Sequence, residues 1–446
     1  MTLAARPTST VFGVTDRPFA ELVESRDAVV AIVGLGYVGL PLAVRYAEQG
    51  FRALGFDVDV DRISALHAGS SHVDDVPDAQ LAPVLASGQF VPTAEPGMLR
   101  GADAVYLCVS TPFDDDHQPD LSFVRAAAQT VGAHLTAGTL VILQSTTYPG
   151  TTEELVQPIL EAASGLTAGV DFHLAYSPER VDPASTEWDL SNTAKICGGV
   201  TPACAEATRV LLDAMIGRPG LVTVVGSPKV AEMAKLAENT YRAVNIAYVN
   251  ELAMLAHAMD IDIWDVLDAA QTKPFGYQRF DPGIGPGGMC IPVNPHYLSW
   301  KANELDVDTR VIELTGDINF AMADYVRDRV TAFLPVDGKR VLCLGAAFKA
   351  GVSDVRNSRA VRVMELLEDA GAHVEFTDPL VGVLMLRGTR REAVDLGTSA
   401  LGDYDLIVAL VRNPAWPRDE LLAAGVPVFD AVNALAGTPG NTYERL

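Results

Sequence analysis

The fold is decided by the stretch Ala28-Val29-Val30-Ala31-Ile32-Val33-Gly34-Leu35-Gly36-Tyr37-Val38-Gly39 near the start of the chain. The apolar run 28–33 predicts a buried strand, and the apolar pattern of 40–47 predicts the helix that follows the glycines. The next predicted strand, 52–56, ends at Asp57, about 20 residues beyond the glycine turn. This order of strand, glycine turn, helix and strand with a terminal acid is typical of a doubly wound domain that binds a dinucleotide.

The same alternation continues through the first half of the chain. Further apolar strands are predicted at 104–109, 140–143 and 172–176, with helical patterns between them, which favours a mostly parallel sheet. Ligands of such sheets bind beyond the carboxyl ends of the strands, so the turns there are expected to line the cofactor crevice. These turns are Ser110-Thr111-Pro112, Ser145-Thr146-Thr147 and Ser177-Pro178-Glu179-Arg180.

A long helix is predicted after the first domain. Ser227-Pro228 is a typical helix start, and the pattern runs from Lys229 to about Met259 without a breaker. Its apolar residues are spread around the helix, so we expect burial on several sides, between domains or at a subunit interface. Lys235 and Asn239 lie four residues apart on one face, where one bound molecule can contact both.

The C-terminal part repeats the first pattern in degraded form. Strand 340–344 leads to a turn, helix 360–370 and strand 374–376, which ends at Asp378; later strands are predicted at 404–410 and 426–430. We therefore predict an α/β protein with two Rossmann-like doubly wound domains, joined by a long central helix and a helical middle domain. The predicted domains are 1–226, 227–334 and 335–446.

Composition limits the partners. The chain has 446 residues, 49% of them hydrophobic and 20% charged, which fits two or three globular domains. Its net charge of -24 would repel nucleic acid and anionic membranes, so neither is expected as a partner. No apolar run approaches the roughly 20 residues of a membrane helix. Met1–Pro7 lacks the apolar segment of a secretory signal, so we expect a loose lead-in and a cytoplasmic location.

Neither a disulfide frame nor a metal site is indicated. The cysteines are odd in number and scattered without C-x-x-C spacing, and the histidines are dispersed. The acidic run Asp114-Asp115-Asp116 is interpreted as a solvated loop. The five cysteines, which we expect to be reduced, are Cys108, Cys197, Cys204, Cys290 and Cys343.

One of these cysteines lies in the glycine-studded stretch Gly283–Pro295. A thiolate at Cys290 can capture an aldehyde as a thiohemiacetal, which can lose a second hydride to give a thioester. The alternative is an inert cysteine in a turn-rich loop. Combined with the dinucleotide motif, the cysteine indicates a dehydrogenase that holds its substrate covalently. A hydroxyacid or hydroxyacyl dehydrogenase would share the Rossmann half but would leave Cys290 and Lys349 without a role.

Five segments, in this order, resemble the UDP-glucose/GDP-mannose dehydrogenase family. They are Gly34–Ala43, Ser177–Arg180, Lys235–Thr240, the cysteine stretch and Phe348–Ser358. The resemblance implies an NAD-dependent oxidation of C6 of a nucleotide sugar from alcohol to carboxylate. Ser177–Pro183 and Thr272–Tyr277 are most similar to the branch with UDP-N-acetylglucosamine 6-dehydrogenases. UDP or TDP, and glucose or N-acetylglucosamine, remain alternatives.

The family resemblance also implies roles for individual residues. Around NAD these are Gly34, Gly36, Tyr37, Val38 and Gly39 at the pyrophosphate, Asp57 and Arg62 at the adenosine ribose, and Thr111, Thr146 and Glu179 on the nicotinamide side. The implied catalytic set is Cys290 as nucleophile, Lys235 beside the oxyanion, Asn239 as its polar companion, and Glu179, Asn294 and Thr146. Besides Lys235 and Asn239, the implied substrate contacts are Lys273, Tyr277, Gly287, Lys349 and Arg356. A homodimer or larger assembly is expected.

Two positions depart from the family pattern. Met289 stands where the family usually has histidine, and Asn294 where it has the aspartate thought to activate the hydrolytic water. Our hypothesis is that Asn294 orients water while Glu179 or Lys235 moves the proton, giving slow but complete oxidation. The alternatives are a stalled thioester or released aldehyde, and a non-catalytic protein that binds NAD or a nucleotide sugar.

Overall fold

The computed structural model describes residues 17–113, 118–397, 401–436 and 442–446. The chain forms two compact units, the first ending at Ala237 and the second beginning at Glu238. The predicted lead-in at 1–7 and the acidic loop at 114–116 lie outside the described residues. The α/β class with parallel sheets is confirmed, and the three-domain division at 226/227 and 334/335 stays a prediction.

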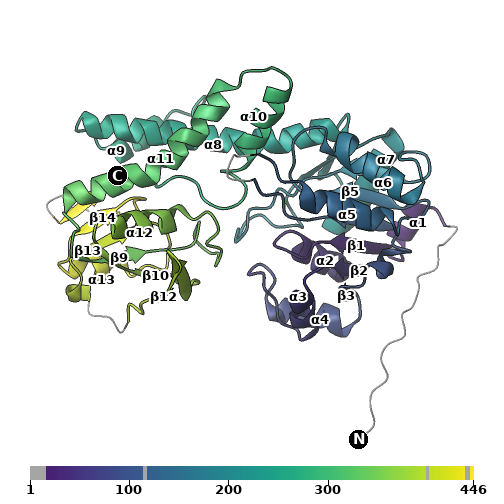
Figure 1. Cartoon of the computed structure of the whole chain (residues 1–446), viewed down its shortest axis with the longest axis horizontal. Helices are drawn as coiled ribbons and strands as arrows, with labels where there is room; N and C mark the ends of the chain where they lie inside the picture. Colours follow the sequence, from purple (N-terminus) through teal and green to yellow (C-terminus); the bar gives the residue numbers. More distant parts are fainter. Residues whose placement is uncertain (1–16, 114–117, 398–400, 437–441) are drawn as a thin grey trace, which may run out of the picture. The chain divides into compact units, whose positions relative to one another are not determined.

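The first unit is built on an eight-stranded sheet in the order β3-β2-β1-β4-β5-β6-β7-β8 (Figure 1). All neighbouring strands run parallel except β6 and β7. The part β3-β2-β1-β4-β5 has the order of a Rossmann domain, and the chain changes direction between β1 and β4. The strands are β1 (Val29–Val33), β2 (Arg52–Phe56), β3 (Phe90–Thr93), β4 (Ala104–Leu107), β5 (Leu140–Leu143), β6 (His173–Tyr176), β7 (Lys195–Gly199) and β8 (Val222–Val224).

Every residue of β1, β4 and β5 is buried, because helices cover both faces of this sheet. Local signals set several helix ends: Asp59 caps α3, and Thr201 caps α7, which closes at Gly217 in a left-handed conformation. The helices are α1 (Phe19–Glu24), α2 (Gly39–Glu48), α3 (Val60–His67), α4 (Asp78–Ala86), α5 (Ser122–Gly132), α6 (Gln157–Ser164) and α7 (Pro202–Ile216). Short helical turns are η1 (Pro96–Leu99) and η2 (Thr152–Val156).

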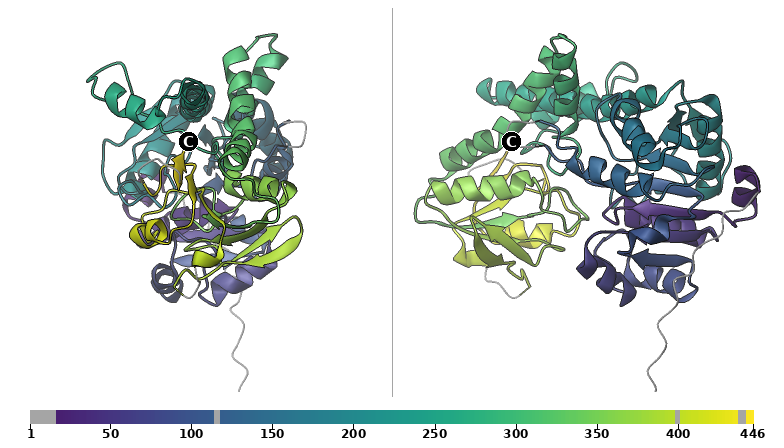
Figure 2. Two further views of the ribbon diagram at one scale, coloured as in Figure 1. Left: turned by 90° about the vertical axis from the view of Figure 1, so that its left-hand side faces the viewer. Right: turned by 45° about the vertical axis from the view of Figure 1, so that its right-hand side comes forward.

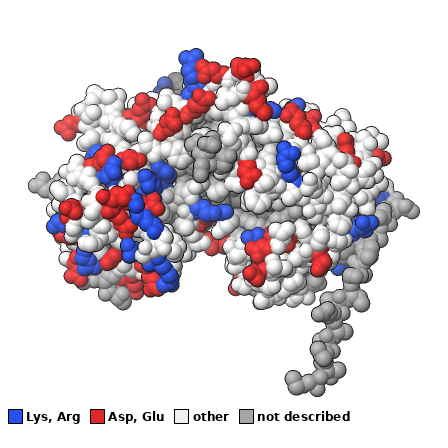
Figure 3. All heavy atoms as spheres, viewed as in Figure 1, with Lys and Arg blue, Asp and Glu red and all other residues white. Residues whose placement is uncertain are grey.

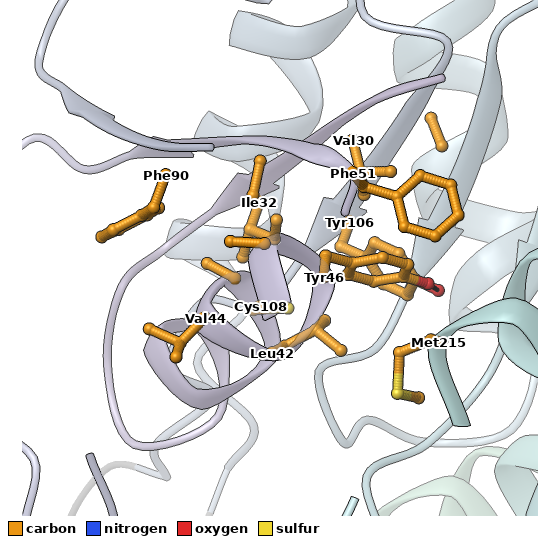
Figure 4. Close-up of a cluster of buried hydrophobic side chains, with 14 of the residues drawn as sticks. Val30, Ile32, Leu42, Val44, Tyr46, Phe51, Phe90, Tyr106, Cys108 and Met215 are labelled. Carbon is orange, nitrogen blue, oxygen red and sulfur yellow. Dashed lines mark hydrogen bonds between the residues drawn. The ribbon is translucent and has the colours of Figure 1, made fainter. Parts of the chain in front are cut away.

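One face of the sheet packs against α2 and α7 in the core cluster drawn in Figure 4. Ile32 of β1 and Leu42 of α2 are fully or almost fully buried there, and Met215 comes from α7. The hydroxyls of Tyr46 and Tyr106 hydrogen-bond to each other at 2.7 Å, so both buried phenols are satisfied. This packing fixes α2, and with it the glycine turn at its start.

The second unit contains a five-stranded parallel sheet in the order β10-β9-β13-β14-β15, a separate hairpin β11-β12, and helices (Figures 1 and 2). The strands are β9 (Arg340–Leu344), β10 (His373–Thr377), β11 (Val383–Leu386), β12 (Thr389–Glu392), β13 (Leu406–Ala409), β14 (Val428–Asp430) and β15 (Tyr443–Arg445). The helices are α9 (Ile263–Ala270), α10 (Asn294–Glu304), α11 (Arg310–Phe333), α12 (Arg359–Asp369) and α13 (Arg418–Ala423), with the turn η3 (Leu401–Asp403).

The predicted long helix is confirmed as α8 (Pro228–Ala258), which begins in the first unit and continues into the second. One face of α8 is exposed within the single chain, so burial of this face, as expected at a subunit interface, stays a prediction. Tyr241, Tyr248 and Leu255 are 53%, 57% and 56% exposed, while Ala243, Ala247 and Ala253 are buried. The exposed residues are seven positions apart and therefore share one face of the helix.

On the face seen in Figure 3, Lys and Arg stand among Asp and Glu rather than in a patch of one sign. Several of them form ion pairs on the C-terminal part of the chain, such as Arg391 with Glu368 at 3.0 Å and Arg340 with Glu375 at 3.3 Å. Over the described residues, no helix combines the length and apolar character that crossing a membrane requires.

Candidate active site

Each glycine in the turn between β1 and α2 occupies its position for a different structural reason. Gly34 has a φ of +94°, and a Cβ there would lie 2.7 Å from the Cys108 carbonyl oxygen. A Cβ on Gly39 would lie 1.8 Å from the Gly34 carbonyl oxygen. A Cβ on Gly36 would meet no atom within 4 Å, so this position has open space beside the backbone. Gly34 and Gly39 are required by packing, and Gly36 leaves room for a ligand to approach the main chain.

Asp57 ends β2 and ties the glycine turn to the second strand. Its carboxylate is 5% exposed and accepts hydrogen bonds from Leu35 N at 2.8 Å and Asp59 N at 3.0 Å. Arg62 of α3 pairs with the same carboxylate at 2.7 Å. The structure therefore brings together the two residues predicted for the ribose, beside a turn in which Tyr37 is partly buried and Val38 is 36% exposed.

Thr111, Thr146 and Glu179 follow β4, β5 and β6. They therefore lie at the carboxyl ends of three neighbouring parallel strands. Thr111 and Thr146 are half-buried. The preceding Ser145 donates its hydroxyl to the Val109 carbonyl at 2.7 Å, which fixes the loop after β5 to the loop after β4.

Glu179 is part of a buried polar network that the sequence patterns did not reveal. Its carboxylate pairs with Lys195, whose side chain is 2% exposed. It also accepts from Arg180 N at 2.7 Å, Val181 N at 2.9 Å and Gln144 Nε2 at 3.1 Å. Burial alone would raise the pKa of Glu179, but Lys195 and the backbone donors outweigh it and lower the pKa. Glu179 is therefore held as a carboxylate and is a weak proton acceptor.

A second buried carboxylate, Glu232 on α8, anchors the segment after β5. It is fully buried and accepts from Gly150 N at 2.5 Å, Thr152 N at 2.9 Å and Thr152 Oγ1 at 2.6 Å. Burial raises its pKa. The start of α8, which carries Lys235, is thereby connected to the loop that carries Thr146. Lys235 is half-buried and makes no hydrogen bond or ion pair within the described part of the chain.

Cys290 differs from the other four cysteines, all five of which lie in described segments. Its side chain is exposed, and Cys108, Cys197, Cys204 and Cys343 are buried. Burial raises the pKa of Cys108 and Cys343 far above the ordinary value, and that of Cys197 to about 12. At Cys204 burial raises the pKa, but hydrogen bonds with His173 and Thr201 lower it to about 7. Exposure thus singles out Cys290 as the accessible thiol.

The glycines around Cys290 are required by close packing in the second unit. A Cβ on Gly285 would lie 2.4 Å from the Asn319 carbonyl oxygen, and one on Gly287 would lie 2.9 Å from Phe348 Cβ. Gly283 N donates to Asn250 Oδ1 at 2.9 Å, which fixes the start of the stretch to α8. The cysteine loop is therefore seated between α8, α11 and the turn that contains Phe348 and Lys349.

Asn294 begins α10 immediately beyond the cysteine loop and is 2% exposed. Its backbone N–H donates to the Cys290 carbonyl at 3.0 Å, and its side-chain Oδ1 accepts from Asn239 Nδ2. The structure thus brings together Asn239, Asn294 and the cysteine segment. Since Oδ1 is occupied by Asn239, the side-chain donor Nδ2 is the other polar group that Asn294 offers.

The predicted substrate cations lie in different settings. Lys349 is half-buried in the turn after β9, next in sequence to Phe348, which packs on Gly287 and Gly288 of the cysteine loop. Arg356 is exposed, but its guanidinium pairs closely with Asp354, with Nη2 to Oδ2 at 2.6 Å. Lys273 is exposed with its Nζ 5.1 Å from the Phe275 ring centre, and Tyr277 nearby is half-buried. Among the described residues, no three His, Cys, Asp or Glu side chains gather as metal ligands would.

Models of one protein family match three successive parts of the chain. The UDP-glucose/GDP-mannose dehydrogenase family matches with its NAD binding domain over 28–216, its central domain over 229–321 and its UDP binding domain over 342–437. A relative named UDP-N-acetyl-D-glucosamine 6-dehydrogenase, from Pseudomonas aeruginosa, is 37% identical over 87% of this chain and 91% of its own length.

Solved structures agree with these matches. The UDP-D-ManNAc dehydrogenase of Pyrococcus horikoshii has a TM-score of 0.83 at 32% identity, covering 94% of this chain and 98% of its own. A UDP-glucose dehydrogenase from Pyrobaculum islandicum has a TM-score of 0.82 at 29% identity, covering 94% and 97%. These similarities extend over both units of the chain.

Proposed function

Because the chain belongs to the UDP-glucose/GDP-mannose dehydrogenase family, we propose that it oxidises C6 of a UDP- or TDP-activated hexose to the uronic acid through Cys290. NAD is its cofactor and a nucleotide sugar its substrate class. The sugar is glucose or N-acetylglucosamine in this proposal, and the names of the relatives make UDP-N-acetylhexosamines the first substrates to test. The exposure of Cys290 is the observation that carries the proposal.

The residues of the first unit fit NAD. Gly36 leaves open space beside the backbone at the start of α2, where a pyrophosphate is favoured, and Asp57 offers a carboxylate at the end of β2 for a ribose. Gly34, Tyr37, Val38 and Gly39 complete the turn, with Arg62 at the ribose and Thr111, Thr146 and Glu179 toward the nicotinamide. When bound, NAD supplies the hydride acceptor for both oxidation steps.

Cys290 would capture the aldehyde formed when C6 loses its first hydride and the hydroxyl its proton. The Sγ–C6 bond forms, the carbonyl oxygen takes up a proton, and the product is a thiohemiacetal. Loss of a second hydride from C6 and of the hydroxyl proton gives the thioester. Water then adds to C6, the C–S bond breaks, the thiolate leaves and the carboxylate is released. Lys235 would stabilise the negative oxygen of these tetrahedral species, with Asn239 as its polar companion.

Hydrolysis is the step that the sequence of this chain makes slow. Asn294 is an amide and cannot take a proton from water, although its Nδ2 can donate to the attacking water or to the oxyanion. Glu179 has a lowered pKa and is engaged with Lys195, which makes it poorly suited as the replacement base. Lys235 is then the remaining group for proton transfer, and we propose slow but complete oxidation.

The nucleotide end of the substrate is assigned to Lys349, with Gly287 at the cysteine loop and Lys273 and Tyr277 on the segment before it. Arg356 is retained as a contact, although its pairing with Asp354 reduces the charge that it offers to a phosphate.

Asn294 also supports a second candidate function, a protein that binds NAD and nucleotide sugars but stalls at the thioester.

We further propose a cytoplasmic homodimer formed through the exposed α8 face of Tyr241, Tyr248 and Leu255.

The test is a count of NADH per sugar. The full chain is mixed with NAD and with UDP-glucose, UDP-N-acetylglucosamine, TDP-glucose or TDP-N-acetylglucosamine, and both NADH and the released acid are measured. Two NADH per sugar with free uronic acid support the proposal. A burst of two NADH per active site followed by almost no turnover identifies the stalled protein. Acid formation by Cys290→Ser at the wild-type rate would refute the covalent mechanism.

A further inference from the structure

The second unit contains a cavity of about 230 Å³ that none of the roles above uses. Pro286 and Pro292 of the cysteine loop line it, together with Phe320 of α11 and the first turns of α12. We call it the Arg359 cavity, because the α12 residues Arg359, Arg362 and Glu365 supply its charged groups. The volume gives room for several water molecules and is therefore large enough for a small ion.

The two arginines of the Arg359 cavity are not equivalent. Arg362 is exposed and pairs with Glu365 at 3.3 Å, one turn along α12. Arg359 is half-buried and forms no ion pair with any residue that the structure describes. Its guanidinium donates through Nη2 to the Phe320 carbonyl oxygen and lies 5.3 Å from the centre of the Phe320 ring. Its Nε is buried and has no hydrogen-bond partner within the described ranges.

The charge of Arg359 is thus only weakly compensated. Burial lowers its pKa, the charge of Arg362 lowers it further, and Asp324 acts in the opposite direction without contact. The ordinary pKa of arginine is so high that the group stays protonated at neutral pH. A partly desolvated guanidinium without a carboxylate is unfavourable for the folded chain, and an anion beside it would remove that cost.

We propose that the Arg359 cavity binds a phosphate-class oxyanion, either free or as part of a larger phosphate-bearing ligand. The planar guanidinium matches a tetrahedral oxyanion in a two-bond geometry. Asn357 also lines the cavity, and its amide donates at 3.4 Å to the Gly288 carbonyl oxygen and to the Met289 sulfur of the cysteine loop. Phe320, Val355 and the two prolines form apolar parts of the wall, next to which a charge interaction is screened less than in open solvent. Glu365 faces the same cavity, but its charge is balanced by Arg362.

Occupancy of the cavity would act on the cysteine loop. Pro286 and Pro292 stand on either side of Cys290 in the sequence and line the cavity, while Gly287 and Gly288 pack on Phe348. An anion held by Arg359 would connect α12 with this loop and favour one conformation of it. The binding itself does not rest on the proposed dehydrogenase function, because it requires neither NAD nor turnover.

The experiment is a titration of the full chain with sodium phosphate against sodium chloride at matched ionic strength, followed by calorimetry and by thermal unfolding. Hydrogen bonds to charged groups predict that Arg359→Gln weakens phosphate binding by about 10- to 100-fold. The matched control is Arg362→Gln in the same cavity, whose exposed pair predicts a change of at most about fivefold. The proposal is overturned if wild type does not bind phosphate above chloride, or if Arg359→Gln binds it as wild type does.

A second variant keeps the test informative if Arg359→Gln does not fold. Val361→Glu places a carboxylate at the cavity wall while Arg359 stays in place. Because Ser358 caps α12, a glutamate three residues later also favours the start of the helix. Loss of phosphate binding is expected, and unchanged binding overturns the proposal. Saturating UDP distinguishes the sources: if it abolishes phosphate binding, the oxyanion belongs to the nucleotide diphosphate, and if both bind together, to a separate ligand.

Discussion

Asn239 on α8 donates its side-chain amide to Asn294 Oδ1 at the start of α10. The bond fixes how Asn294 is turned: Oδ1 accepts from Asn239, and Nδ2 remains as a donor on the other side of the amide. A carboxylate at the same place could keep the bond from Asn239 with one oxygen and accept a proton with the other. The identity of residue 294 therefore sets the chemistry available beside the cysteine loop without changing how the segment is held.

We expect Asn294→Asp to raise the steady-state rate of acid formation about 10-fold or more, because general-base catalysis typically contributes at least that much. The capture of the aldehyde and both oxidation steps should be unaffected. In stopped-flow measurements the NADH burst should therefore merge into the faster steady state, while the initial rate of NADH formation stays the same. The control is Asn294→Ala, which removes the partner of Asn239 and supplies no base. If Asn294→Asp formed acid at the wild-type rate, a step other than proton removal at position 294 would limit turnover.

Alkylation should distinguish Cys290 from the other thiols. In the native chain, iodoacetamide should modify Cys290 alone, because the remaining four cysteines are buried. Cys204 is the strictest control: its pKa of about 7 would make it reactive if burial did not protect it. Intact-mass and peptide analysis should give one label on wild type and none on Cys290→Ala. Labelling of Cys204 at a comparable rate would contradict the argument from exposure.

Features formed by neighbouring residues could be predicted from the sequence, whereas pairs of residues far apart along the chain could not. Gly34, Gly39 and Asp57 could be identified because strand, turn and helix follow one another directly. Lys195 and Glu232 were missed because their partners Glu179 and Thr152 lie 16 and 80 positions away, and only the folded sheet pairs them. The hairpin β11-β12 was also missed, since Thr389–Glu392 is exposed and lacks apolar alternation.

Arg356 shows what the family pattern leaves open. The pattern implies a phosphate contact, which stays a prediction, and the structure adds that the Arg356 guanidinium pairs with Asp354, two residues before it. Arg359, three residues later, has no such partner among the described residues. Whether an arginine is available to a ligand depends on side-chain pairing, which the spacing of charges along a turn does not determine.

The Glu179–Lys195 pair should make stability depend on pH in a defined direction. The pKa of Glu179 is lowered on folding, so the pair stabilises the chain above the ordinary glutamate pKa, and this contribution is lost as the pH falls through the folded value. Lys195→Met leaves a buried carboxylate unpaired and should cost about 3–5 kcal/mol at neutral pH. Urea unfolding at several pH values measures this.

The double variant Glu179→Gln with Lys195→Met serves as the control for that prediction, because it leaves no buried charge. It should recover most of the lost stability, and its own unfolding free energy should no longer change with pH through the titration of Glu179. If Lys195→Met unfolds at the same urea concentration as wild type at neutral pH, the pair is not the buried interaction described above.

The exposed face of α8 predicts the assembly state. Leu255→Lys should convert the proposed homodimer to a monomer, because a lysine in an apolar interface would be desolvated without a partner. Leu314→Lys is a matched control, since Leu314 on α11 has nearly the same exposure, 57% against 56%. Light scattering after size exclusion should give half the wild-type mass for the first variant and the wild-type mass for the second. Equal masses in all three would exclude the α8 face as the interface.

Two glycines of the first turn should separate folding from cofactor binding. Gly39→Ala places a Cβ 1.8 Å from the Gly34 carbonyl oxygen, so the backbone must move, at a cost of about 1–3 kcal/mol or more in unfolding free energy. Gly36→Ala meets no atom within 4 Å, so the chain should unfold at nearly the wild-type temperature. The added methyl would instead occupy the space that the pyrophosphate needs, and NAD affinity, measured by calorimetry, should fall by about 10-fold or more. Unchanged NAD affinity in Gly36→Ala would show that the pyrophosphate does not bind beside Gly36, because the added methyl group has no other atom of the turn to clash with.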